Sequence, residues 1–129
     1  NSSIAIIDKR RPYAGKSEVM NIVGNVKNKN CVIVDDIIDS GGTIVNAAEA
    51  LKNKGAKEVY VYITHAVLSG HAVEKIEKSK IKKLITTDTI DNSKKIKNSK
   101  KIEIISIAPI ISEAMKRIAN STSVSSLFK

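Results

Sequence analysis

The stretch Val32–Thr43, VIVDDIIDSGGT, decides the fold and the site that the rest of the chain must support. It begins with a run of apolar, mostly β-branched residues, which is typical of a buried strand. Asp35 and Asp36 follow within that run, and a third acid and the sequence Ser-Gly-Gly-Thr lead into a helical pattern. A strand that passes through a tight turn into a helix is the unit from which α/β sheets are built.

The acids and glycines of this stretch suit a phosphorylated sugar. Asp35 and Asp36 stand at the carboxyl end of the expected strand, where ligands bind in open α/β sheets. Adjacent carboxylates repel each other, and a sugar diol or a magnesium-bound ligand supplies the donors or the cation that they need. Gly41 and Gly42 let the backbone turn tightly, so the N–H groups of Ser40–Thr43 can bind an anion at the start of the helix. The stretch therefore predicts a sugar-phosphate pocket.

Helix capping by an acid and a serine is the plain structural alternative for this stretch. Capping does not require three acids followed by two glycines, so the ligand-binding interpretation is favoured. The stretch is not a Walker loop, because no Gly-Lys-Ser/Thr ends it, and its glycine spacing differs from that of the dinucleotide-binding fingerprint.

Short β-branched runs alternate with helical patterns along most of the chain. Strands apolar throughout that alternate with helices predict an α/β domain with a mostly parallel sheet flanked by helices on both faces. We expect strands over Ile4–Asp8, Cys31–Asp36, Glu58–His65, Lys83–Thr87 and Ile102–Ile107, and helices over Ile44–Lys54, over Ala72–Lys78 and from Pro109 onward.

Three polar stretches fall outside this alternation. Lys9–Glu18 is predicted to be a mobile loop, and the lysine-rich stretch Asp91–Lys101 is predicted to be a solvated surface loop. Asn120–Lys129 is a serine-rich tail. His65 ends a strand, where it either faces the site or is a buried, hydrogen-bonded histidine. The roles of His65 and of the loop Lys94–Lys101 stay open.

Composition limits the classes of function. The chain has 129 residues, enough for one modest domain, and a formal net charge of +9. Such a charge could attract nucleic acid, membranes or phosphorylated small molecules. Three tyrosines and one phenylalanine are too few for the stacking platforms of single-strand binders, and no apolar run reaches the roughly 18 residues of a membrane helix. One cysteine excludes an internal disulfide, so we expect a reducing, cytoplasmic compartment. Because aromatic residues are few and apolar runs are short, we expect the protein to bind neither nucleic acid nor membrane.

VIVDDIIDSGGT resembles the phosphoribosyl-diphosphate binding motif of type I phosphoribosyltransferases. Further stretches resemble the C-terminal half of a related family, the ribose-phosphate diphosphokinases or phosphoribosyl diphosphate synthetases, and their order and spacing match across nearly the whole chain. These stretches are IAIIDKRRP (Ile4–Pro12), EVMNIVGNV (Glu18–Val26), THAVLSGHAVEKI (Thr64–Ile76), SIAPIISEAMKRI (Ser106–Ile118) and SVSSLF (Ser123–Phe128). On these motifs the chain is identified as a member of that family, with a type I phosphoribosyltransferase-like fold.

The resemblance implies transfer of diphosphate from ATP to the C1 hydroxyl of ribose 5-phosphate. The product, phosphoribosyl diphosphate, feeds nucleotide synthesis. ATP is then the co-substrate, Mg²⁺ the cofactor, and a homo-oligomer the expected assembly. The alternatives are a phosphoribosyltransferase that uses the same loop, a regulatory paralogue without turnover, and a nucleic-acid binder built around the basic residues of Lys75–Lys101.

The resemblance also assigns roles to residues of this sequence. Asp35 would hold ribose hydroxyls, with Asp36 beside it. The residues expected to wrap the 5-phosphate are Asp39, Ser40, Gly41, Gly42 and Thr43. Lys9 and Arg11 match basic residues of the family's mobile catalytic loop, where cations stabilise charge on the transferring diphosphate. Arg11 is also expected to contact ribose 5-phosphate, and the metal ligands stay unknown.

The resemblance implies that a large part of the family's chain is absent here. We expect residues 1–120 to form the phosphoribosyltransferase-like C-terminal domain without its first strand and helix. Residues 121–129 are expected to be a tail that packs on the absent N-terminal domain. The prediction is therefore a fragment that is inactive by itself, although it could still bind ribose 5-phosphate.

Overall fold

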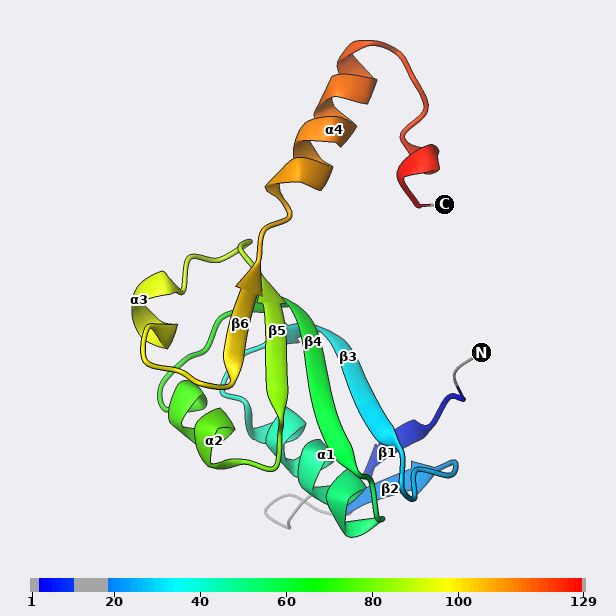
Figure 1. The fold of residues 1–129 in the computed structure, drawn as a ribbon, viewed down its shortest axis with the longest axis vertical. Coiled ribbons are helices and arrows are strands. Elements are labelled where there is room, and N and C mark those ends of the chain that lie inside the picture. The colour runs from blue at the N-terminus through cyan, green and yellow to red at the C-terminus, as the bar shows by residue number, and fades with distance from the viewer. Residues whose placement is uncertain (1–2, 11–18, 129) are drawn as a thin grey trace.

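The computed structural model describes residues 3–10 and 19–128, with the backbone alone at positions 9, 10, 19 and 20 (Figure 1). Its strands are β1 (Ile6–Arg10), β2 (Val19–Val23), β3 (Asn30–Ile38), β4 (Glu58–Ala66), β5 (Lys83–Thr87) and β6 (Ile102–Ile105). Its helices are α1 (Gly42–Asn53), α2 (Ala72–Lys78), α3 (Ser93–Ile96) and α4 (Ala108–Ala119), and a 3₁₀ turn follows at Ser125–Phe128.

The larger sheet has the strand order β3-β4-β5-β6, and every neighbouring pair in it is parallel. Asp35 of β3 lies opposite Ile63 of β4, and Ile63 lies opposite Thr86 of β5. The carboxyl ends of these strands therefore meet at one edge of the sheet. This arrangement confirms the α/β class and the mostly parallel sheet.

A separate antiparallel hairpin precedes this sheet. β1 pairs with β2 from Ile6 opposite Val23 to Arg10 opposite Val19. The sequence predicted a strand over Ile4–Asp8 but not its partner, and it placed Lys9 and Arg10 in a loop, whereas their backbone belongs to β1. The polar stretch between the two strands hid the pairing, because each strand is short and has little apolar alternation of its own.

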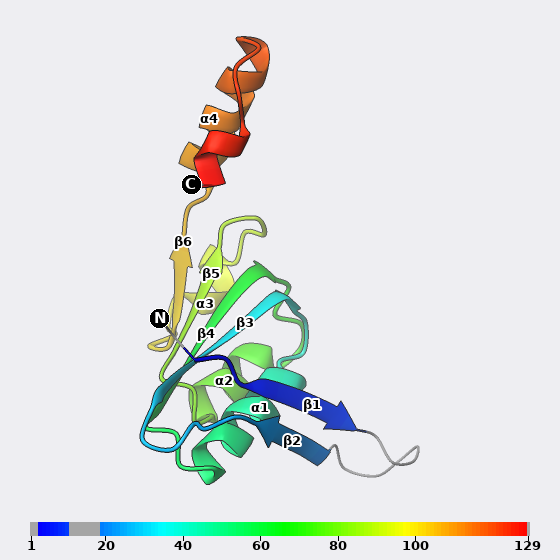
Figure 2. The ribbon, with the colours of Figure 1, turned by 90° about the vertical axis from the view of Figure 1, so that its right-hand side faces the viewer.

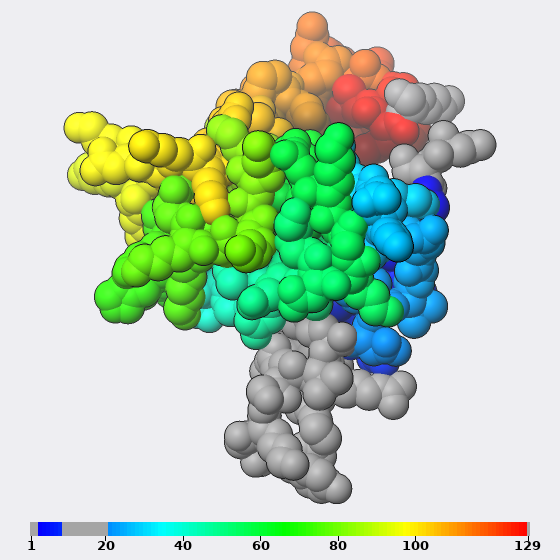
Figure 3. All heavy atoms as spheres, turned by 60° about the horizontal axis from the view of Figure 1, so that its bottom comes forward, coloured from blue at the N-terminus to red at the C-terminus, as the bar shows by residue number. Residues whose placement is uncertain are grey.

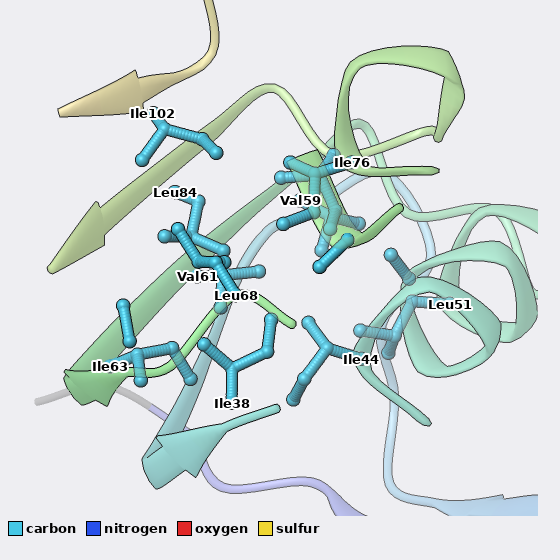
Figure 4. Packing of buried hydrophobic residues seen from close by; sticks show 14 of the residues in the cluster. Ile38, Ile44, Leu51, Val59, Val61, Ile63, Leu68, Ile76, Leu84 and Ile102 are labelled. Carbon is cyan, nitrogen blue, oxygen red and sulfur yellow. The ribbon is translucent and has the colours of Figure 1, made fainter. Parts of the chain in front are cut away.

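One face of the parallel sheet carries the hydrophobic core (Figure 4). α1 and α2 cover this face, and α1 also contacts β2. Side chains with almost no exposure alternate along β4 and β5, as a period of two residues requires. The centre of the core consists of Val59, Val61, Ile63, Leu84, Ile44, Leu51, Leu68 and Ile76. Burial of one such side chain stabilises the fold by about 1.5–3 kcal/mol.

The opposite face of the sheet is open among the described residues, so the expectation that helices cover both faces is wrong for this structure. Val34 is 76% exposed, and Tyr62 and Ile105 are 44% and 52% exposed. α4 follows β6 but stands away from the sheet in both ribbon views (Figures 1 and 2), and none of its residues is buried. Without that helix, the alternate side chains of each strand face solvent.

The chain after α4 folds back along the helix. The guanidinium group of Arg117 bonds Glu113 within α4, the carbonyl oxygen of Ser123 at 2.9 Å, and the hydroxyl of Ser126. Phe128 is 81% exposed. The serine-rich tail thus contacts α4 of its own chain.

The expected surface loop Asp91–Lys101 contains a short helix, α3, and one buried residue. Asn92 is 1% exposed and donates from Nδ2 to the carbonyl oxygen of Ala66 at 2.5 Å. This region and the β1–β2 hairpin lie at opposite sides of the face shown in Figure 3.

Across the described part of the chain, no helix has the length and apolar character needed to cross a membrane.

Candidate functional site

The acidic residues of the candidate site lie near the end of β3. The strand continues to Ile38, two residues beyond its expected end, so Asp35 and Asp36 lie inside it and their side chains leave on opposite faces. Both residues are exposed, and the amide of Asp36 donates to Oδ1 of Asp35 at 2.9 Å. The strand geometry therefore separates the two carboxylates, which relieves their repulsion.

A groove runs between residues 3–7, β3 and α1. Asp35 and Thr43 both line it, together with Ile44 of the first turn of α1. Asp36 is not among its lining residues. The structure thus brings Asp35 and Thr43, which directly follows Gly42, to the same groove.

The glycine turn, Asp39–Thr43, leads into α1. Gly41 has φ +77°, a conformation that residues with a Cβ rarely adopt, and Gly42 is the first helical residue. The amide of Val45 donates to the carbonyl oxygen of Gly41 at 3.0 Å, which is the first bond of the helix. The N-cap residue, Gly41, has no side chain with which to cap this end of α1, and the first turn has no acid. Such a helix end, with its dipole, suits an anion.

The β4–α2 connection holds the turn from one side. The carbonyl oxygen of Ile38 accepts from the amide of Val67 at 2.9 Å, and that of Asp39 accepts from the amide of Ser69 at 3.1 Å. Lys75 of α2 adds a bond from Nζ to the carbonyl oxygen of Ser40 at 3.3 Å. No sequence pattern indicates these contacts, because they join segments that are distant in the chain.

The other predicted site residues are placed less completely. Asp39 and Ser40 are exposed, whereas Gly41 is buried against the side chain of Ile38 and against Ala72. The backbone of Lys9 lies in β1 opposite Met20, and Arg11 lies outside the described residues.

His65 lies at the same edge of the sheet. It is exposed, so the interpretation as a buried histidine is wrong, but it is hydrogen-bonded: Nδ1 lies 3.0 Å from Oγ1 of Thr89. Thr87 donates to the carbonyl oxygen of Thr64 at 2.7 Å, so a group of threonines surrounds the end of β4. The threonines at the end of the predicted strand Lys83–Thr87, with Thr89 just after it, were the signal that could have revealed this group.

Asp88 closes this edge on the β5 side. The hydroxyl of Ser106 and the amide of Ile107 bond its carboxylate, and these donors hold the pKa of Asp88 below its usual range. Among the residues that the structure describes, no three His, Cys, Asp or Glu side chains lie close enough together to hold a metal ion. The described edge therefore offers one carboxylate on each face of β3, hydroxyls and a helix N-terminus.

A family model described as "Phosphoribosyl synthetase-associated domain" matches residues 5–129, which is nearly the whole chain. The chain belongs to the phosphoribosyl synthetase-associated domain family. The family-level resemblance of the sequence motifs is thereby confirmed.

Two proteins that are similar in sequence to this chain carry the same name. The chain is 56% identical over 128 residues to a ribose-phosphate pyrophosphokinase of Hyphomonas neptunium, covering 99% of this chain and 41% of the relative. A ribose-phosphate pyrophosphokinase of Clostridium tetani is also 56% identical over 128 residues, covering 99% of this chain and 40% of the relative. The chain thus spans about two fifths of the length of the curated relatives that it matches.

The fold of this family member is also similar to a solved structure. The crystal structure of phosphoribosylpyrophosphate synthetase from Mycobacterium smegmatis aligns with a TM-score of 0.79 at 33% identity. The alignment covers 91% of this chain and 37% of the other. The α/β architecture with its parallel sheet is therefore shared with that protein.

Proposed function

We propose that this chain is the ribose 5-phosphate-binding part, from the C-terminal half, of a ribose-phosphate pyrophosphokinase. The observation that carries the proposal is the glycine-rich start of α1, whose Thr43 lines the same groove as Asp35 of β3. The relatives named ribose-phosphate pyrophosphokinase support it at 56% identity. The reaction would move a diphosphoryl group from ATP to the C1 oxygen of ribose 5-phosphate and release AMP.

In this proposal the sheet edge binds the sugar and the helix start binds the phosphate. Asp35 would accept hydrogen bonds from ribose hydroxyls in the groove, whereas Asp36, next to it in the chain, leaves on the other face of β3. The N–H groups of the turn from Asp39 to Thr43 would bind the 5-phosphate, and the hydroxyls of Ser40 and Thr43 would add donors. A backbone cradle at a helix start suits a phosphate because the N–H groups and the helix dipole both favour negative charge.

Lys9 and Arg11 are proposed as the cations that stabilise charge on the transferring diphosphate. Phosphoryl-type transfer depends on positioning and on cations aimed at the developing charge, rather than on covalent chemistry by the protein. Removal of one such group costs a few kcal/mol of barrier in comparable sites.

Mg²⁺ and ATP are proposed as further components of the whole protein. Mg²⁺ is held in enzymes by one or two carboxylates together with substrate phosphates, so the carboxylate of Asp35 in the groove has suitable oxygen atoms. When bound, the ion would neutralise phosphate charge. Because this chain spans about two fifths of its relatives, we propose that it is inactive alone. Residues 1–120 would form the phosphoribosyltransferase-like domain, and residues 121–129 would pack on the N-terminal domain. The whole protein would be a homo-oligomer.

Calorimetric titration of ribose 5-phosphate into the 129-residue chain tests this proposal. We expect binding by the native chain and a loss of at least about tenfold in affinity for Asp35→Asn, since hydrogen bonds to charged groups are worth about 1.5–3 kcal/mol. Glu49→Gln, on the exposed side of α1, is the matched control and should bind like the native chain. A folded chain that gives no heat with ribose 5-phosphate contradicts the proposal for this chain, and steady AMP formation from ATP by the chain alone contradicts its inactivity.

A further inference from the structure

Three successive carbonyl groups at the start of the glycine turn are bonded on the same side. Those of Ile38 and Asp39 accept from backbone amides of the β4–α2 connection, residues 67–71, at 2.9 and 3.1 Å. That of Ser40 accepts from Nζ of Lys75 at 3.3 Å. The turn is therefore fixed through its carbonyl oxygens, and Lys75 supplies the last of these bonds.

This arrangement determines where the amides of the turn point. The described chain has no cis peptide bond, and in a trans peptide the C=O and the following N–H point in opposite directions. The N–H groups of Asp39, Ser40 and Gly41 are therefore directed away from the β4–α2 connection. Bonds to the carbonyl oxygens thus fix the direction in which these amides point.

The β4–α2 connection is itself held from its other side by residues of the α3 region. Nζ of Lys95 donates to the carbonyl oxygen of Val67 at 2.9 Å and lies 3.4 Å from that of Leu68. Asn92, which is 1% exposed, donates to the carbonyl oxygen of Ala66. The connection is thus clamped between the glycine turn and α3, which Figure 1 shows beside it at the sheet edge.

The backbone of the β4–α2 connection is strained at Leu68. It is only 2% exposed and has φ +51°, a left-handed conformation that costs an ordinary residue about 1–2 kcal/mol. Backbone conformations of this kind persist where the surroundings over-determine them. The amide bonds to the glycine turn and the Lys95 bonds are the surroundings that hold it.

We propose that Lys75 and Lys95 are positioning residues for the phosphate-binding turn. Lys75 fixes the Ser40 carbonyl directly, and Lys95 fixes the connection that bonds Ile38 and Asp39. The inference rests on the proposed function, because it assigns these lysines to the 5-phosphate end of that site. A pre-ordered cradle binds more tightly because less freedom is lost when the ligand arrives.

A direct attraction between a lysine charge and the phosphate is the competing explanation, and it makes a different prediction. A direct charge effect leaves the unliganded turn as it was, whereas loss of a positioning bond loosens the turn before any ligand is present. The order of the unliganded turn therefore separates the two.

The test compares Lys75→Met and Lys95→Met with two matched controls, Lys80→Met and Lys94→Met, which remove an exposed lysine from the same regions. In ¹⁵N relaxation of the unliganded chain, we expect the amide order parameters of residues 40–43 to fall from about 0.85 to about 0.6 in the first pair only. The Kd for ribose 5-phosphate should rise about fivefold in the first pair, and Lys75→Arg should restore both values.

Unchanged order parameters in both Lys75→Met and Lys95→Met overturn the inference, whatever the affinities are. Should Lys95→Met fail to fold, Lys75→Met and its rescue by arginine decide the matter alone. A native chain that does not bind ribose 5-phosphate, but whose turn loosens in Lys75→Met, refutes the proposed function and leaves the positioning role standing. The two failures are therefore distinguishable.

Discussion

The amide N–H of Ser69 donates to the carbonyl oxygen of Asp39 at 3.1 Å. This bond lies just beyond the last paired residues of β3 and β4, Ile38 and Ala66. It extends the parallel hydrogen-bonding ladder into the two loops that follow the strands. The glycine turn is consequently attached to the rigid sheet, and its shape is set by the fold rather than by a ligand.

The two glycines of the turn should respond to alanine in opposite ways. Gly41→Ala places a Cβ on a residue with φ +77°, which should lower the free energy of unfolding by about 1 kcal/mol and the melting temperature by about 4 °C. Gly42→Ala meets no atom within 4 Å and lies in the helix, where alanine is favoured over glycine by up to about 1 kcal/mol. Thermal unfolding followed by circular dichroism measures both. Equal shifts in the two variants contradict the positive φ assigned to Gly41.

Local chemistry explains why the glycine turn could be predicted from the sequence. The strand, the acids, the glycines and the helix of Val32–Thr43 are adjacent in the chain, so propensity and position act together. The strand Lys83–Thr87 and the helix Ala72–Lys78 were predicted with the bounds that the structure shows. The family-level resemblance is confirmed, whereas the roles of the individual site residues stay predictions.

Features set by long-range packing could not be predicted in this way. The β1–β2 hairpin depends on pairing across a polar stretch. The bonds to the carbonyl oxygens of the glycine turn and of the β4–α2 connection come in part from Lys75 and Lys95, which look like surface lysines in the sequence. Strands that are apolar throughout predicted a sheet covered on both faces, but such a pattern states only that a face is apolar and not what it contacts.

The open position of α4 gives a second prediction. Leu84→Ala removes a side chain with 0% exposure from the centre of the sheet and should cost about 2–5 kcal/mol of unfolding free energy. Ile110→Ala changes a residue of α4 that is 57% exposed, so its cost should stay within about 0.5 kcal/mol. Urea denaturation of both variants measures the difference. A large loss in Ile110→Ala means that α4 packs against the chain in solution.

Glu77 gives a pH dependence with a defined sign. Partial burial raises its pKa, but bonds to Oε1 from the Ser99 hydroxyl at 2.5 Å and from the amides of Lys101 and Lys100 outweigh burial, and the pKa lies below the ordinary 4.5. A carboxyl whose folded pKa is depressed contributes stability above its unfolded pKa, and this contribution is lost as the pH falls through the folded value. The native chain should therefore lose stability below about pH 4.5 more steeply than Glu77→Gln does.

Urea denaturation at pH 7 and at pH 3.5 measures this difference. Glu49→Gln is the matched control, because it removes an exposed carboxylate from α1, and it should keep the slope of the native chain. Parallel pH profiles for the native chain and Glu77→Gln contradict the assigned hydrogen bonds.

Arg117 should control the order of the tail without supporting the core. Its guanidinium joins Glu113 of α4 at 2.7 Å to the carbonyl oxygen of Ser123 and the hydroxyl of Ser126, and its side chain is 28% exposed. Arg117→Met keeps an apolar stem but removes these donors, so the amide order parameters of residues 123–128 should fall below about 0.6. The melting temperature should change little, because partly exposed ion pairs contribute at most about 1 kcal/mol. Lys116→Met, an exposed neighbour on the same helix, should leave the tail ordered, and a tail that loosens equally in both variants means that Arg117 does not hold it.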